Sequence, residues 1–225
     1  MSQKEIRKIT CPACSHPYPF PLWVDVNTEE LTDIQNHIKS RELFTCTCPE
    51  CGKKALIDYG MLYHDPQKKL MICYSQEEQP IQNAFQEFRK KQEEEPEYAE
   101  YVFRVVSSQN GLREKLVIFD ADLDDRYLEI IKLIILRNLE AKDPELEVTG
   151  SFFLVDSEGR YIIEYLSENK VAVTVEVKQK MYDEIKERFH ADLLEAHDAS
   201  FIINQAWAFE YLRFVDKRAH AMQQS

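Results

Sequence analysis

The chain has 225 residues, of which 44% are hydrophobic and 30% charged, so it can bury a substantial core. It contains only five glycines, and none are spaced as a phosphate-binding loop, which excludes the glycine-rich nucleotide motifs. The net charge of −12 disfavours binding to nucleic acids and to anionic membranes. No segment resembles a signal peptide or a membrane span, so we expect a cytoplasmic protein without membrane contact.

The acidic charge is concentrated in the second part of the chain. Residues 1–75 contain nine basic and nine acidic residues, which leaves 19 basic and 31 acidic residues of the totals of 28 and 40. We therefore expect three parts. Residues 1–75 form a cysteine-rich domain, residues 76–97 an acidic helical connector, and residues 98–225 an acidic α+β domain.

The cysteine-rich part alternates short strand and helix patterns. Residues 22–26 alternate in the manner of a strand, and residues 27–43 have the apolar spacing of a helix with Asn27 as its N-cap. Residues 54–64 and 68–74 then resemble two strands joined by an Asp-Pro turn. The sequence thus predicts a β domain of the zinc-ribbon type with an inserted helix.

The acidic part is predicted to combine a three-stranded antiparallel meander with helices. A strand is expected at 101–107, and a long buried helix begins at the N-cap Asp124 and ends before Pro144. Three strands separated by turn-like segments follow, and two helices close the chain. The expected strands are 151–155, 160–166 and 171–177, and the expected closing helices are about 179–196 and 203–221.

Two C-P-x-C motifs, "CPAC" and "CPEC", carry the clearest chemistry. Their thiolates can form a tetrahedral shell, and four protein ligands leave no position for water, so we expect a structural zinc ion. A thioredoxin-like dithiol would need a single motif at a helix start, and disulfides are not expected in a chain without an export signal. The expected ligands are Cys11, Cys14, Cys48 and Cys51.

The segments around both motifs resemble the CpXC domain family of bacteria and archaea, over roughly residues 9–130. The resemblance implies a zinc-binding domain without an established biochemical activity, and it implies the same four cysteine ligands. One departure is Ser15, where many zinc knuckles have glycine. The 33 residues between the two motifs exceed the spacing of a compact zinc ribbon, which is about 15–20 residues, so the intervening strand and helix are an insertion.

Other residues with metal-binding chemistry have simpler interpretations. His16 is expected to be a solvated loop residue, and Cys46 and Cys73 are expected to be small core side chains. The acidic stretch 120–125 resembles the start of a calcium loop, but it lacks the required glycine and the final glutamate. It is better interpreted as a helix N-terminus, with a weak divalent-ion site or an acidic contact surface as the alternative.

The favoured function is a non-enzymatic structural-zinc protein that binds another protein in an interaction or regulatory role. The last helix supports a partner surface, because Trp207, Tyr211 and Phe214 can share one face while Phe209 points elsewhere. A fully buried closing helix is equally compatible with this pattern. We also expect metal removal or Cys48→Ser to unfold residues 1–75.

Two other functions remain open at this stage. A nucleic-acid-binding ribbon would use four lysines with Tyr59 or Tyr63 for stacking, although the net charge disfavours it. A hydrolase-type enzyme would use His64 with nearby acids, although no nucleophile motif accompanies them. The lysines available for nucleic acid are Lys53, Lys54, Lys68 and Lys69.

Overall fold

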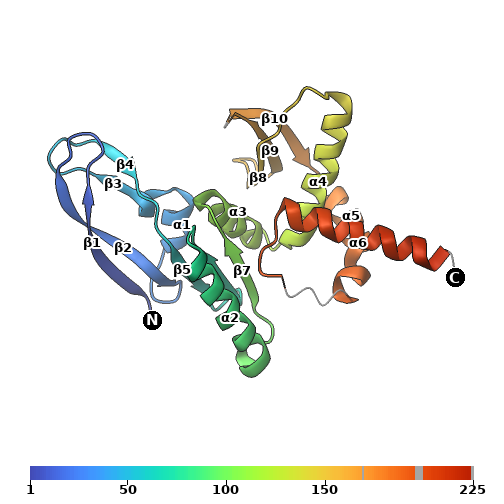
Figure 1. The fold of residues 1–225 in the computed structure, drawn as a ribbon, viewed down its shortest axis with the longest axis horizontal. Helices are drawn as coiled ribbons and strands as arrows, with labels where there is room; N and C mark the ends of the chain where they lie inside the picture. The colour runs from blue at the N-terminus through green and yellow to red at the C-terminus, as the bar shows by residue number, and fades with distance from the viewer. Residues whose placement is uncertain (169, 196–199, 224–225) are drawn as a thin grey trace. The chain divides into compact units, whose positions relative to one another are not determined.

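The structure is a computed structural model that describes residues 1–168, 170–195 and 200–223. The chain divides into two compact units, Met1–Leu116 and Val117–Ser225. Figure 1 shows the elements of both units in chain order. The fold is mixed α and β, with separate sheets in the two units.

The first unit holds seven strands and the helical segments between them. Its elements are β1 (Gln3–Thr10), β2 (Pro17–Asn27), α1 (Ile34–Lys39), the 3-10 helix η1 (Glu42–Phe44), β3 (Thr45–Thr47), β4 (Lys54–Leu56), β5 (Met61–Asp65), β6 (Leu70–Tyr74), α2 (Glu78–Glu94), the 3-10 helix η2 (Pro96–Tyr98), β7 (Val102–Val106) and α3 (Gln109–Asp120), which crosses into the second unit.

Five of these strands form one mixed sheet in the order β1-β2-β5-β6-β7. The β1/β2 and β5/β6 pairs are antiparallel hairpins, and the β2/β5 and β6/β7 pairs are parallel. Strands β3 and β4 form a separate two-stranded antiparallel sheet. The second knuckle hairpin is therefore an insertion in the connection from β2 to β5.

The core of the first unit lies around β6, because all five of its residues are buried. A strand buried on both faces is typical of the centre of a covered sheet. Helix α2 lies along β6 and β7 and buries Ala84 and Phe88. The Phe88 ring packs on that of Phe103 in β7 with 4.7 Å between ring centroids.

Strand β7 belongs to the first unit, although the sequence suggested a boundary before it. Each residue of β7 pairs with one of β6, from Leu70 with Val102 to Tyr74 with Val106. Residues 76–97 are therefore mostly the helix of a parallel crossover between two adjacent strands, and the chain divides after Leu116. Charge composition suggested the earlier boundary because α2 has a highly charged outer face.

The helix expected over residues 27–43 is much shorter in the structure. Asn27 does not cap it, because its Oδ1 accepts the N–H of Glu29 at 2.9 Å and forms a local turn. Asp33 and Arg41 both have φ near +64°, outside the right-handed helical region, and they bound α1 and η1. The apolar periodicity is nevertheless used, since Ile34 and Ile38 are both buried.

The second unit contains the predicted meander and the predicted helices. Strands β8, β9 and β10 form an antiparallel sheet in the order β10-β9-β8. The elements of this unit after α3 are α4 (Asp125–Lys142), β8 (Gly150–Val155), β9 (Tyr161–Ser167), β10 (Lys170–Val177), α5 (Gln179–Glu195) and α6 (Gln205–Gln223).

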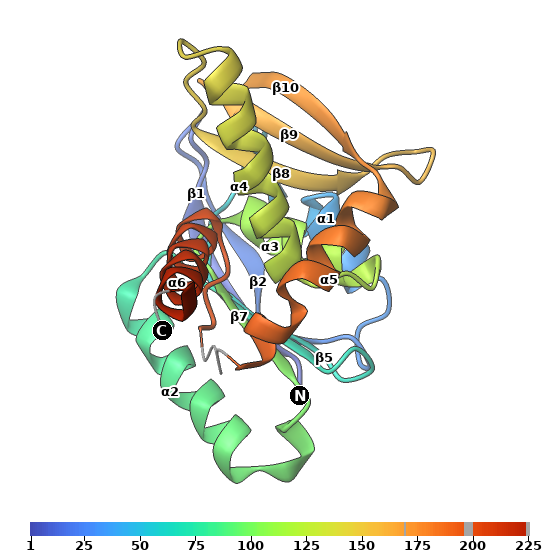
Figure 2. The same cartoon turned by 90° about the vertical axis from the view of Figure 1, so that its right-hand side faces the viewer.

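Helix α4 is the centre of the second unit. Its N-cap is Asp124, as predicted, whose Oδ1 accepts the N–H of Arg126 at 2.9 Å. Figure 2 shows α4 lying across the three-stranded sheet, where Phe153, Ile163 and Tyr165 join its core. Within the described residues, no helix combines the length and the apolar character required to cross a membrane.

Candidate metal centre

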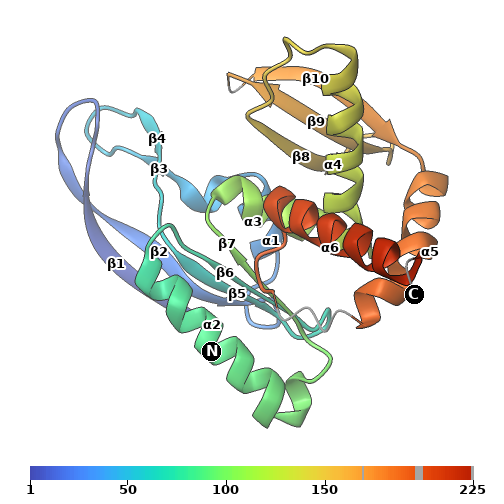
Figure 3. The ribbon, with the colours of Figure 1, turned by 45° about the vertical axis from the view of Figure 1, so that its right-hand side comes forward.

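The two C-P-x-C motifs occupy the tips of two hairpins. The first connects β1 to β2, and the second connects β3 to β4. Figure 3 shows these hairpins beside one another in the first unit. The fold thus brings together two cysteine pairs that are far apart in sequence.

The first knuckle is a tight turn with two backbone hydrogen bonds. The N–H of Cys11 donates to the carbonyl of His16 at 2.9 Å, and the N–H of Ser15 donates to the carbonyl of Cys11 at 2.9 Å. Ser15 has φ of +60°, a left-handed conformation that glycine adopts more readily. The sequence departure at this position therefore places a strained residue in the turn.

The second knuckle repeats the same pattern. The N–H of Cys48 donates to the carbonyl of Lys53 at 3.0 Å, and the N–H of Gly52 donates to the carbonyl of Cys48 at 3.0 Å. Gly52 has φ of +69° and corresponds to Ser15 in the first turn. The two knuckles are thus equivalent turns that present their thiols in the same way.

The four sulfur atoms converge. All of them lie within 4.8 Å of one another, and the Sγ atoms are 3.7 Å apart for Cys11 and Cys51 and 3.6 Å apart for Cys14 and Cys48. A tetrahedral shell with metal–sulfur bonds near 2.3 Å has sulfur–sulfur separations of about 3.8 Å. The donor set therefore fits one ion of that size, and each close pair joins the two knuckles.

The local electrostatics favour a cation at the cluster. Backbone N–H groups of Cys14 and Ala13 lower the pKa of the Cys11 thiol to about 6. The His16 backbone N–H lowers the pKa of Cys14, but desolvation and the three neighbouring sulfurs outweigh it and raise that pKa to about 12. Without a cation, the thiols cannot all ionise at this spacing, because adjacent thiolates repel one another. A bound metal ion removes this conflict.

A small hydrophobic cluster supports the knuckles. Cys46, in β3, is buried there and donates its thiol to the carbonyl of Ala55 at 3.4 Å. The prediction that it is a core side chain is confirmed. The sequence analysis did not identify Tyr18, which lies in β2 and is buried beneath the knuckles. Its interaction with Cys46 and its burial raise the pKa of its hydroxyl. The cluster comprises Cys11, Tyr18, Cys46 and Cys48, flanked by Ile9, Phe20, Ala55 and Ile57.

The match to known families agrees with this geometry. Residues 9–132, 124 of 225, match the CpXC family, whose description is CpXC protein. The chain belongs to the CpXC family. Comparisons with curated proteins and with solved structures found no match. The CpXC segment contains both knuckles, the last two residues of β1, the other four strands of the main sheet, and the first part of α4, so the family match extends beyond the metal centre.

No second group of ligands converges among the residues that the structure describes. The cysteine cluster is the one set of at least three potential ligands found there, and it does not include His16. In the acidic stretch, Asp120 ends α3 and Asp124 caps α4, which agrees with the interpretation as a helix N-terminus. Cys73 is buried in β6, as expected for a core side chain, and burial raises its pKa to about 11.

The predicted nucleic-acid residues come from two different sheets of the first unit. Lys54 lies in β4 and follows Lys53, whereas Lys68 and Lys69 lie at the turn between β5 and β6 of the other sheet. All four are exposed, and Lys69 forms an ion pair with Glu100.

The aromatic part of that prediction was wrong. Tyr59 is 8% exposed and donates its hydroxyl to the carbonyl of Leu43 at 3.2 Å. Tyr63 is fully buried and donates its hydroxyl to Asp65 at 3.3 Å. Both rings lie in the core, so neither can stack on a base. The hairpin predicted around the Asp-Pro turn is present, but the single strand expected over residues 54–64 is divided into β4 and β5, which belong to different sheets. Apolar alternation did not reveal this break, nor which face of the strands is buried.

His64 is not placed in a catalytic arrangement with the neighbouring acid. It is half-buried in β5, its Nε2 lies 3.2 Å from the hydroxyl of Tyr101, and burial lowers its pKa. The carboxylate of Asp65 instead accepts the N–H of Lys68 at 3.1 Å and thereby closes the β5–β6 turn.

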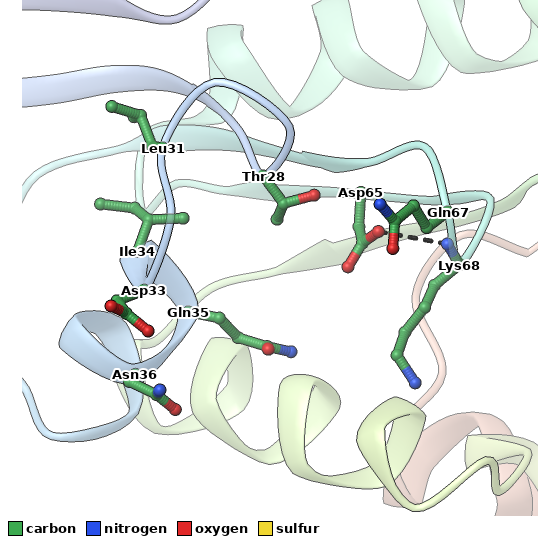
Figure 4. A pocket seen from close by; sticks show the side chains of 9 residues that line it. All are labelled: Thr28, Leu31, Asp33, Ile34, Gln35, Asn36, Asp65, Gln67 and Lys68. Atoms are coloured by element: carbon green, nitrogen blue, oxygen red, sulfur yellow. Dashed lines mark hydrogen bonds between the residues drawn. The ribbon is translucent and has the colours of Figure 1, made fainter.

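A polar pocket of about 290 Å³ lies beyond the carboxyl ends of the parallel strands β2 and β5. Figure 4 shows Gln35 extending from α1 toward the side occupied by Asp65 and Lys68. His64 is not among the lining residues, so the pocket does not unite it with the acids. The lining residues are Thr28, Leu31, Asp33, Ile34, Gln35, Asn36, Asp65, Gln67 and Lys68.

Proposed function

We propose that this CpXC protein is a non-enzymatic zinc protein that acts as a protein-interaction or regulatory module in the cytoplasm. The convergence of four cysteine sulfurs supports the metal assignment, because an all-thiolate tetrahedral shell is typical of structural zinc. A shell filled by protein ligands leaves no site for water or substrate, which argues against Lewis-acid catalysis. A reducing compartment keeps such thiols available as ligands.

The zinc ion would fix the two knuckle hairpins. The apolar cluster beneath them is small, and β3 and β4 have only three residues each. Hairpins of this size are at best marginally stable in isolation. In the proposal, metal binding therefore supplies the stability that the local core lacks.

The second unit supports the interaction role through α6. Phe209 is 41% exposed and Phe214 is 48% exposed, whereas Tyr211 is buried against the core and stacks on Trp207 with 5.3 Å between ring centroids. Arg213 lies 5.6 Å from the Phe209 ring centroid. Exposed aromatic side chains next to arginine are enriched at the centres of protein interfaces.

The nucleic-acid alternative receives less support. Its lysines are divided between two sheets, both proposed stacking residues are buried, and the net charge is −12. A net negative charge of this size repels phosphate backbones.

The decisive experiment is metal analysis of the full chain purified without chelators or added metal. We expect one zinc per chain, and we expect the Cys14→Ser, Cys51→Ser double variant to lose it. A Cys73→Ser variant serves as the control, because Cys73 lies outside the cluster. Protein without bound zinc, or zinc retained by the double variant, would overturn the proposal.

A further inference from the structure

The cysteine cluster is asymmetric in its exposure. Each knuckle contributes one exposed cysteine, Cys14 or Cys51, and one buried cysteine, Cys11 or Cys48. Two sulfur–sulfur contacts combine these two classes across the knuckles, at 3.6 Å for Cys14 with Cys48 and 3.7 Å for Cys51 with Cys11. Each exposed cysteine of the cluster thus has a buried cysteine of the other hairpin as a sulfur neighbour.

We propose that Cys14 and Cys51 are sites of reversible oxidation by hydroperoxides, and that oxidation converts the metal shell into two crossed disulfides, Cys14–Cys48 and Cys11–Cys51. The part of this inference that concerns the zinc-loaded protein rests on the proposed zinc function. Metal coordination keeps the thiols ionised, and an accessible thiolate is the species that reacts with peroxide.

The reaction balances without a further reactant. Peroxide oxidises an exposed thiolate to a sulfenic acid, which the neighbouring buried thiolate attacks to form the disulfide with release of water. For the whole centre, the zinc tetrathiolate, two hydrogen peroxide molecules and four protons give free zinc, two disulfides and four water molecules. Each disulfide reduces one peroxide by two electrons, and a thiol reductant with zinc restores the starting state.

The two sulfur contacts across the knuckles are suited to crossed disulfides. A disulfide has a sulfur–sulfur bond near 2.05 Å, so each observed pair has to close by roughly 1.6 Å, which small rotations of the cysteine side chains can supply. Crossed disulfides would also keep the β1–β2 hairpin tied to the β3–β4 hairpin after the metal leaves. Disulfides within each motif would separate the two hairpins instead.

Peptide mapping distinguishes these outcomes. Trypsin cleavage at Lys8, Lys39, Arg41 and Lys53 yields peptides 9–39 and 42–53, and each carries one knuckle. The full zinc-loaded chain is treated with hydrogen peroxide, alkylated, digested without reductant and analysed by mass spectrometry, while a colorimetric chelator measures released zinc. We expect one zinc released per chain and the two peptides linked by two disulfides.

Stepwise reduction and alkylation of the linked peptides assigns the two bonds, which we expect to be Cys14–Cys48 and Cys11–Cys51. Separate peptides with internal disulfides, the opposite crossed pairing, or irreversible sulfinic acids without disulfides would overturn the proposal. Cys73 is an internal control in the same digest, because burial raises its pKa to about 11 and it should remain a thiol.

The two proposals fail in different ways. Absence of zinc from the untreated chain would overturn the zinc function, while peroxide treatment of the metal-free chain would still show which cysteines pair. Full zinc occupancy together with a shell that resists peroxide, or that oxidises within each knuckle, would overturn only the oxidation proposal.

Discussion

Ser15 and Gly52 occupy equivalent positions in the two knuckles with φ of +60° and +69°. The left-handed conformation is disfavoured for residues with a Cβ by about 1 kcal/mol. Apart from Gly52 and its two chain neighbours, no atom lies within 4 Å of the position a Cβ would take on Gly52, so side-chain clashes would not complicate a substitution there. The two turns therefore have the same backbone conformation at this position, but glycine adopts it more readily than serine does.

We predict that Ser15→Gly stabilises the first knuckle by about 1 kcal/mol, which is about a fivefold improvement in metal retention against a chelator. Gly52→Ser should have the opposite effect, of similar size, in the second knuckle. Competition with a zinc-binding dye measures both. The backbone explanation is incorrect if the two substitutions shift retention in the same direction.

Phe209 provides a test of the interaction surface at the level of one side chain. It is 41% exposed and lies against Arg137 and Arg213, so Phe209→Ser should lower the free energy of unfolding by only about 1 kcal/mol, whereas binding to a protein partner should fall at least tenfold. Met181→Ser is the matched control, because Met181 is 39% exposed on α5. Thermal unfolding and quantitative co-purification from native cells measure the two effects, and equal losses for both variants would contradict the prediction.

At the level of elements, long periodic segments were predicted well and special backbone positions were not. The meander strands, α4 and its cap were expected because their patterns extend over many residues. The length of helix α1 was overestimated, because Asp33 and Arg41 adopt positive φ values and bound the helix, which apolar spacing does not reveal. The four cysteines were identifiable from their motif, whereas Tyr18 depends on tertiary contact with Cys46.

The N-cap of α4 gives a prediction for one element. Asp124→Ala removes the acceptor of the Arg126 N–H and should lower the free energy of unfolding of the second unit by about 1 kcal/mol. Asp124→Asn should retain most of that stability, because asparagine caps helices as well as aspartate does, although it loses the ion pair with Arg126. Chemical denaturation followed by circular dichroism compares them, and equal losses would assign the effect to the ion pair.

On the scale of the whole molecule, the metal centre and the main sheet of the first unit have separate cores. The knuckles rest on the small cluster around Tyr18 and Cys46, whereas the sheet is buried around Tyr63, Ile72 and Phe103. Composition suggested a boundary near residue 75, but it cannot reveal that β7 returns to pair with β6. The sequence analysis expected metal loss to unfold all of residues 1–75. Because the main sheet has its own core, we now expect the unfolding to be confined to the knuckle hairpins.

We predict that chelation removes amide-exchange protection from β3, β4 and the tips of β1 and β2, while β5, β6 and β7 remain protected. The reason is that the sheet core does not depend on the knuckle cluster. Hydrogen exchange measured by mass spectrometry, with and without chelator, tests this. Simultaneous loss of protection in β5–β7 would show that the unit unfolds as one body.

The return of β7 to β6 also sets an order for folding during synthesis. Both knuckles have been translated once residue 51 is made, and their hairpins are local, whereas the main sheet lacks an edge strand until residue 106 has emerged. Local contacts form faster than those that must close long loops. Nascent chains would therefore capture their metal ion before their largest hydrophobic core is complete, with β6 lacking one neighbour while α2 is being made.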